Sequence, residues 1–265
     1  MPDGSLLLLG HGSHLDQNSS KPVHAMADQL AALKHFRRVD VAFWKEEPAV
    51  SRWNDRYRKG ETVVAVPVFI SDGYFTREVL PRELGLDGGG AAARAMVNQP
   101  APTEGRDYRR ANVHGIDLRY TRPVGAHSAL AGVIRDRANE AGAGPADAVV
   151  VLGHGTRRNP DSELNVYSQA STVRAMGLFS EVVTVFMEQP PEMARVFELT
   201  AARRVFMVPL FIAEGWHVGQ TIPEEMEIDG GEVRQNDRTL IYTPPVGTHP
   251  AMANVVVQLA NEALA

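Results

Sequence analysis

The sequence contains no cysteine among its 265 residues. Disulfides, iron–sulfur clusters, thiolate zinc sites and cysteine nucleophiles are therefore excluded from this chain. Any metal that it handles must be held by His, Asp or Glu. The phosphate-binding signatures of P-loop and dinucleotide-binding proteins are also missing, as is the Gly-x-Ser-x-Gly elbow of serine hydrolases. We therefore expect no nucleotide cofactor.

Basic residues are fewer than acidic ones, which gives a formal net charge of −5 and a pI near 6.0. This balance shows no electrostatic footprint for nucleic acid. The first apolar run, Leu6 to Leu9, follows no basic region and is too short for a signal segment. No later run approaches the roughly 20 apolar residues that span a bilayer. We expect a cytoplasmic protein with no membrane or nucleic-acid partner, and an oligomeric state that the sequence does not fix.

Four segments recur in the same order, which indicates one unit written twice. The pairs are Leu6–Ser13 with Val149–Thr156, Glu46–Pro48 with Glu188–Pro190, Val66–Tyr74 with Val208–Trp216, and Tyr120–His127 with Tyr242–His249. The separation between copies drops by about 20 residues before the last pair. This drop places an insertion in the first copy, near 88–108, where Gly, Ala and Pro predict a surface loop.

Each copy alternates short apolar runs with helical stretches, which is typical of a parallel sheet covered by helices on both faces. In the second copy, strands are expected near 148–152, 182–187, 204–209 and 239–242, and helices near 161–176, 191–201, 222–228 and 249–263. In the first copy, strands are expected near 6–9, 39–43, 62–68 and 118–120. The predicted fold is α/β, with two flavodoxin-like parallel-sheet halves, residues 1–145 and 146–265, related by a pseudo-twofold axis.

Three polar side chains follow successive strands of the second half. His154 comes after the first strand, Glu188 after the second and His217 in the loop after the third. Ligands bind beyond the carboxyl ends of strands in open parallel sheets, so these side chains should meet at one rim. Two imidazoles and a carboxylate suit a divalent first-row metal. The first half offers His11 and Glu46 but has Phe75 opposite His217.

A structural reading competes with the functional one for some of these histidines. His11 and His154 both lie in a Gly-His-Gly turn, which the fold itself could require. His217 has no histidine counterpart, so maintenance of the fold does not explain it. His127 and His249 recur at equivalent helix starts, and we expect them to be structural.

Leu-Gly-His-Gly-[Ser/Thr] after the first strand and Pro-Leu-Phe-Ile-Ala-x-Gly-x-His after the third resemble the CbiX-like class II metallochelatases. This family includes sirohydrochlorin cobaltochelatases and ferrochelatases, and the match covers nearly the whole chain in the long form with two fused copies. The resemblance implies ATP-independent insertion of Co²⁺, Fe²⁺ or Ni²⁺, with the metal as substrate, into sirohydrochlorin or a related tetrapyrrole of cobalamin or siroheme biosynthesis. It also implies one active site, with His154, Glu188 and His217 as metal ligands and catalytic groups.

Sirohydrochlorin carries several carboxylates and a flat ring, which call for cationic and aromatic side chains near the rim. The residues predicted to contact the substrate are Arg157, Arg158, Thr156, Trp216, His11, Glu46 and Arg77. Two other classes stay open at this point: a metal or tetrapyrrole carrier without turnover, and a hydrolase or phosphatase that uses a rim histidine.

Overall fold

The computed structural model describes residues 4–14, 17–86, 108–156 and 161–265. Arg157, Arg158 and almost all of the expected insertion at 88–108 lie outside the described residues. Contacts divide the chain into two compact units: unit 1 comprises Met1–His127 with Ala253–Ala265, and unit 2 comprises Ser128–Met252.

Unit 1 contains a five-stranded sheet in the order β2-β1-β3-β5-β4. Its strands are β1 (Ser5–Gly10), β2 (Val39–Phe43), β3 (Thr62–Pro67), β4 (Tyr108–Val113) and β5 (Ile116–Thr121). Its helices and helical turns are η1 (Gln17–Ser19), α1 (Lys21–Ala32), η2 (Val50–Arg56), η3 (Phe75–Val79), α2 (Leu80–Glu83), η4 (Val124–Ala126) and most of α8 (Met252–Leu264). Four neighbouring strands of this sheet, β2-β1-β3-β5, pair in parallel.

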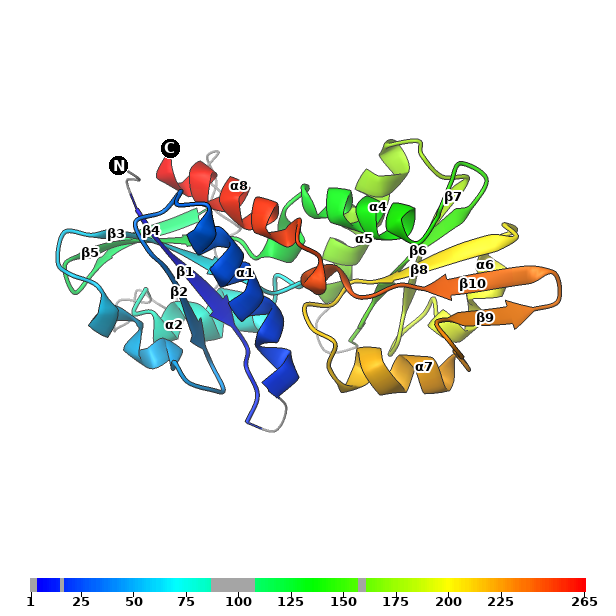
Figure 1. Cartoon of the computed structure of the whole chain (residues 1–265). Helices are drawn as coiled ribbons and strands as arrows, with labels where there is room; N and C mark the ends of the chain where they lie inside the picture. The colour runs from blue at the N-terminus through cyan, green and yellow to red at the C-terminus, as the bar shows by residue number, and fades with distance from the viewer. Residues whose placement is uncertain (1–3, 15–16, 87–107, 157–160) are drawn as a thin grey trace. The chain divides into compact units, whose positions relative to one another are not determined.

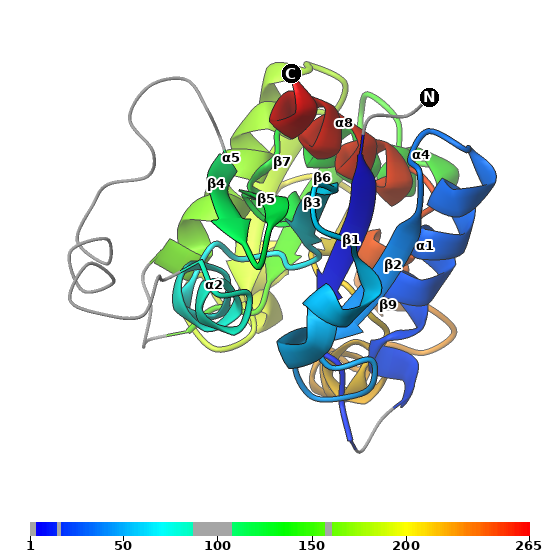
Figure 2. The same cartoon turned by 90° about the vertical axis from the view of Figure 1, so that its left-hand side faces the viewer.

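Every side chain of β1 is apolar or small, and all of them are buried. Helices therefore cover this strand on both faces of the sheet. Leu7 and Leu9 pack with Trp53 of η2 and Leu80 of α2 on one face. On the opposite face lie α1 and α8, and α8 runs beside β1 (Figure 2). The last turn of α8 meets the start of β1, where a Cβ added at Gly4 would lie 3.0 Å from a Leu264 methyl group.

Unit 2 repeats this architecture in the strand order β7-β6-β8-β10-β9. Its strands are β6 (Ala148–Gly153), β7 (Glu181–Phe186), β8 (Arg204–Pro209), β9 (Glu232–Gln235) and β10 (Arg238–Tyr242). Its helices and helical turns are α4 (Leu130–Glu140), α5 (Asp161–Ala175), η5 (Met193–Arg195), α6 (Val196–Leu199), η6 (His217–Thr221), α7 (Ile222–Glu225) and η7 (Val246–Thr248). The two α/β sheets agree with the predicted fold class, and each expected strand is present within a residue or two of its expected bounds.

The structure adds an antiparallel edge strand to each sheet that the sequence analysis did not predict. β4 pairs with β5, and β9 pairs with β10, as the hairpin at the edge of unit 2 in Figure 1 shows. Charged side chains stabilise the β4–β5 hairpin, because Asp117 accepts hydrogen bonds from Arg110 at 2.7 Å and from Arg119 at 3.2 Å. Charges on an exposed edge also discourage pairing with another chain.

The compact units and the sequence repeat are not divided at the same residues. Helix α4 ends the first copy of the repeat but packs in unit 2, whereas α8 ends the second copy but packs in unit 1. A buried histidine binds each transferred helix: His127 contacts Glu262 of α8 at 3.0 Å, and His249 contacts Glu140 of α4 at 3.1 Å. Both histidines are thus in structural contacts, as expected from their recurrence.

None of the helices in the described ranges is both long and apolar enough to cross a bilayer.

Candidate functional site

The turn after β6 places His154 at the carboxyl edge of the unit 2 sheet. Packing requires glycine at Gly153, where an added Cβ would lie 2.8 Å from a Val166 methyl group and 3.0 Å from the Phe186 ring. Gly155 has φ +75°, a conformation that favours glycine. The glycines therefore serve the fold, and they leave the imidazole between them partly exposed at the rim.

The protonation of His154 follows from its nearest partner. Nδ1 lies 2.8 Å from the carbonyl oxygen of Gly155, and a carbonyl can only accept a hydrogen bond. Nδ1 therefore carries the proton, which leaves the Nε2 lone pair for a metal ion or an incoming proton.

Glu188 comes from the loop after β7 and approaches the same imidazole. Its backbone N–H donates to the His154 carbonyl at 3.1 Å, so the two strand-end loops are joined. The Glu188 carboxylate lies 3.9 Å from His154 Nδ1. The acid therefore lies beside the imidazole at the same rim.

His217 completes the group from the loop after β8. Its ring centroid lies 5.0 Å from that of His154, with the two rings at right angles. His217 begins the π-helical turn η6, and the Tyr242 hydroxyl donates to the Val218 carbonyl of that turn at 3.0 Å. Burial raises the pKa of Tyr242 well above its usual range, aided by Glu214, so this hydroxyl stays a neutral donor.

The strand-end rule thus brings the three predicted side chains to one rim. His154 and Glu188 expose 43% and 54% of their side chains, and His217 is exposed. Within the described ranges, no three His, Asp or Glu side chains converge tightly enough to hold an ion. In this structure the rim is therefore an open arrangement and not the closed ligand shell of a structural metal site.

The corresponding rim of unit 1 corrects one pairing that the sequence suggested. The repeat placed Glu46 opposite Glu188, but the backbone N–H that donates to the His11 carbonyl is that of Lys45, at 2.8 Å. Lys45 is therefore the counterpart of Glu188. The mismatch arose because Glu-x-Pro occurs in both loops one residue out of step. Unit 1 keeps the histidine His11, but a lysine stands where unit 2 has its acid. It also lacks the second histidine, because Phe75 begins the turn η3 at the position where His217 begins η6.

The true counterpart of Glu46 is Gln189, which the sequence analysis missed. Gln189 Oε1 accepts from the Thr156 backbone N–H at 2.8 Å, just as Glu46 Oε2 accepts from that of Ser13 at 2.9 Å. Gln189 Nε2 also donates to Glu163 of α5. This amide therefore ties the histidine turn to α5 directly beside Glu188. Aligning the copies on Gly-His-Gly rather than on Glu-x-Pro would have revealed it.

The remaining predicted contacts differ in their surroundings. Trp216 is the most exposed large apolar side chain among those described, at 70%. Arg77 forms an ion pair with Asp72 at 3.1 Å. His11 packs edge-on against Phe75, with ring centroids 4.9 Å apart. Thr156 contributes its backbone N–H to Gln189, as described above.

Comparisons with known proteins identify the family of the chain. The model of the CbiX family matches residues 5–141 and again residues 148–263. A probable sirohydrochlorin cobaltochelatase of Halobacterium salinarum is 35% identical, over 98% of this chain and 91% of that protein.

Solved structures share the fold. A multi-domain protein of Deinococcus radiodurans, described as structurally similar to chelatases, superposes with a TM-score of 0.81 and 27% identity. The match covers 99% of this chain and 56% of that one. SirB from Bacillus subtilis, solved with Fe³⁺, has a TM-score of 0.73 and 18% identity, with coverage of 99% and 96%. Two family matches that together span nearly the whole chain, with a relative of similar length, show that this protein belongs to the CbiX family.

Proposed function

We propose that this protein inserts a divalent metal, Co²⁺ or Fe²⁺, into sirohydrochlorin, and that the rim of unit 2 carries out the insertion. The observation that carries the proposal is the meeting of His154, Glu188 and His217 at one exposed strand-end rim. The name of the Halobacterium relative supports cobalt and this macrocycle. We also propose that the reaction takes place in the cytoplasm.

Insertion exchanges two pyrrole N–H protons for one divalent cation. In the proposed reaction, His154 Nε2 and His217 receive the hydrated metal weakly and pass it to the ring nitrogens. Because His154 Nδ1 already donates to a carbonyl, Nε2 is the atom that accepts one pyrrole proton once it has released the metal. The Glu188 carboxylate, 3.9 Å from Nδ1, accepts the other proton. No nucleotide takes part.

The open rim suits a metal that is a substrate. A closed set of ligands would retain the ion, whereas exchangeable positions allow the macrocycle to replace water and protein ligands. The exposed Trp216 ring, next in sequence to His217, offers an apolar surface for the flat macrocycle. Thr156 lies in the turn beneath the rim, and we assign Arg157 and Arg158, which follow it, to the substrate carboxylates.

A visible-spectrum assay tests the proposal. Protein is mixed with sirohydrochlorin and Co²⁺ or Fe²⁺, and the absorbance bands of the ring are followed. We expect His217→Ala and His154→Ala to slow insertion by about a hundredfold, within the range for loss of a proton-transfer group. His35→Ala removes an exposed histidine after α1 and should match the parent.

Two outcomes would contradict the proposal at different levels. If His217→Ala inserted metal as fast as the parent, the site assignment would be wrong. If the ring bound without being metallated by any tested ion, the protein would be a carrier rather than an enzyme.

A further inference from the structure

The π-helical turn that carries His217 has a counterpart in unit 1, and one contact is common to both. In each unit, a tyrosine near the end of the neighbouring strand donates its hydroxyl hydrogen to a carbonyl of the turn. Tyr242 donates to the Val218 carbonyl at 3.0 Å, and Tyr120 donates to the Thr76 carbonyl at 2.6 Å. The bond from tyrosine is therefore part of the repeated unit.

Unit 1 holds its turn with a second set of hydrogen bonds. The Thr76 hydroxyl donates to the Asp72 carboxylate at 2.9 Å and accepts from the Gly73 N–H at 2.9 Å. These bonds join the loop before the turn to the turn itself, so the position of η3 does not depend on Tyr120 alone. We call Thr76, Asp72 and Gly73 the threonine clamp.

Unit 2 lacks the threonine clamp. In the register of the repeat, the position of Thr76 is taken by Val218, which has no hydroxyl and is buried in the core. The position of Asp72 is taken by Glu214, which is exposed. Among the side-chain hydrogen bonds in the described part of the chain, only the one from Tyr242 reaches η6. The Tyr242 hydroxyl therefore does alone what two groups share in unit 1.

This single bond ties His217 to the sheet that also carries His154. His217 begins η6, one residue before the carbonyl that accepts from Tyr242. Tyr242 lies in β10, which pairs with β8, and β8 pairs with β6, the strand that ends just before His154. The two imidazoles, 5.0 Å apart between ring centroids, are thus related through the sheet by the tyrosine hydroxyl.

We propose that Tyr242 is a positioning residue for metal transfer, whose hydroxyl holds η6 so that His217 and His154 bind the same ion. This rests on the proposed function, which makes the two histidines metal ligands. An ion held by two imidazoles lies about 2 Å from a nitrogen of each. A turn that is free to shift spends part of its time with one ring out of reach, and the affinity for metal falls with the fraction of molecules that have both rings in place.

Titration of the whole chain with Co²⁺, in the absence of any macrocycle, tests the proposal. The absorption bands of bound Co²⁺ report its coordination geometry. Tyr242→Phe keeps the ring and removes the hydroxyl. We expect it to weaken Co²⁺ binding about threefold to tenfold, as for loss of one neutral hydrogen bond, and to change the shape of the bands. In the insertion assay, the KM for metal should rise by a similar factor, with a smaller change in kcat.

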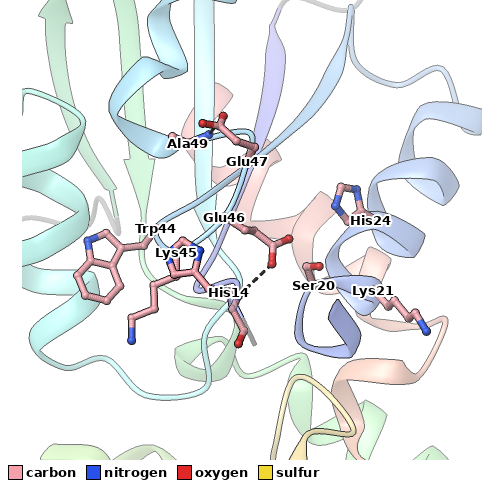
Figure 3. A pocket seen from close by; sticks show the side chains of 10 residues that line it. His14, Ser20, Lys21, His24, Trp44, Lys45, Glu46, Glu47 and Ala49 are labelled. Atoms are coloured by element: carbon pink, nitrogen blue, oxygen red, sulfur yellow. Dashed lines mark hydrogen bonds between the residues drawn. The ribbon is translucent and has the colours of Figure 1, made fainter. Parts of the chain in front are cut away.

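Tyr120→Phe is the matched control, because it removes the same bond from the corresponding turn of unit 1. A lysine replaces the acid at that rim. Figure 3 shows Lys45 beside Trp44 on the wall of its pocket, and Lys45 Nζ lies 5.0 Å from the centre of the Trp44 ring. We expect both tyrosine variants to lower the melting temperature, but only Tyr242→Phe to change the affinity and spectrum of Co²⁺. A purely structural role would make the two variants alike.

Moving the threonine clamp into unit 2 provides a rescue. Val218→Thr and Glu214→Asp supply both of its side chains, next to Gly215 at the position of Gly73. Added to Tyr242→Phe, these changes should restore most of the Co²⁺ affinity and the original bands.

The outcomes separate this proposal from the proposed function. Equal Co²⁺ affinity of the parent and Tyr242→Phe would overturn the positioning role, and so would a loss that Tyr120→Phe shares in full. Weaker Co²⁺ binding that the clamp restores, in a protein that metallates no ring, would uphold the positioning role while the proposed function failed. Metal insertion by the parent, with Co²⁺ binding unaffected in Tyr242→Phe, would show the reverse.

Discussion

Replacing Gln189 with glutamate tests whether this amide holds the histidine turn in place. The new carboxylate could still accept from the Thr156 N–H, but the donor to Glu163 would be lost and two carboxylates would face each other. A hydrogen bond to a charged group contributes about 1.5–3 kcal/mol, and the half-buried setting favours the lower end. We therefore expect Gln189→Glu to lower the free energy of unfolding by about 1.5 kcal/mol.

Urea unfolding followed by circular dichroism measures this loss. The double variant Q189E/E163Q keeps the bond from the Thr156 N–H and restores the bond between residues 189 and 163 with its donor and acceptor exchanged, so most of the stability should return. Since Gln189 also fixes the loop that carries Glu188, the single variant should raise the KM for metal, and the double variant should bring it back. Glu46→Gln is the control in unit 1, where the acceptor to Ser13 is retained. Equal stability of the single and double variants would refute the reasoning.

Three further predictions concern the framework of the site. Gly247→Ala places a Cβ about 2.0 Å from the Ile212 carbonyl oxygen, so we expect a loss of more than ~3 kcal/mol or failure to fold, checked by thermal melts. A double-mutant cycle on His127 and Glu262 should give a coupling of about 1 kcal/mol, and additive single effects would exclude a stabilising contact. Burial opposes ionisation of Asp117, but its two arginine partners outweigh burial and lower its pKa. Its contribution to stability is therefore full above the pKa of the unfolded chain and lost as pH falls through the lowered value, and acid titration of Asp117→Asn should lack that component.

The sequence predicted the parallel strands and the rim because both depend on strong local signals. Continuous apolar runs such as Val149–Leu152 can only be buried strands in this context, and the strand-end rule then fixes which loops meet. The three rim side chains followed without any knowledge of the fold family. The antiparallel strands β4 and β9 were missed because they are edge strands rich in charged residues, with no apolar alternation to reveal them.

Two features depended on information that a repeat does not contain. A helix pattern shows which face of α8 is apolar but not which sheet covers it, so the transfer of α4 and α8 between units could not be read from periodicity. The pairing of Glu46 with Glu188 failed for a different reason. The matching Glu-x-Pro letters lie one position out of step with the Gly-His-Gly turns, and the hydrogen bonds of Lys45 and Glu188 show that the register of the turns is the correct one.

The exchange of terminal helices has a consequence for how the gene could be rearranged. Cutting the chain between its two copies, at 142–147, separates each sheet from its last helix and makes assembly depend on the concentration of two fragments. The end of α8 already lies against Gly4 at the start of β1. A circular permutant joined there and opened at 142–147 would reverse the order of the copies while keeping every helix with its sheet on a single chain.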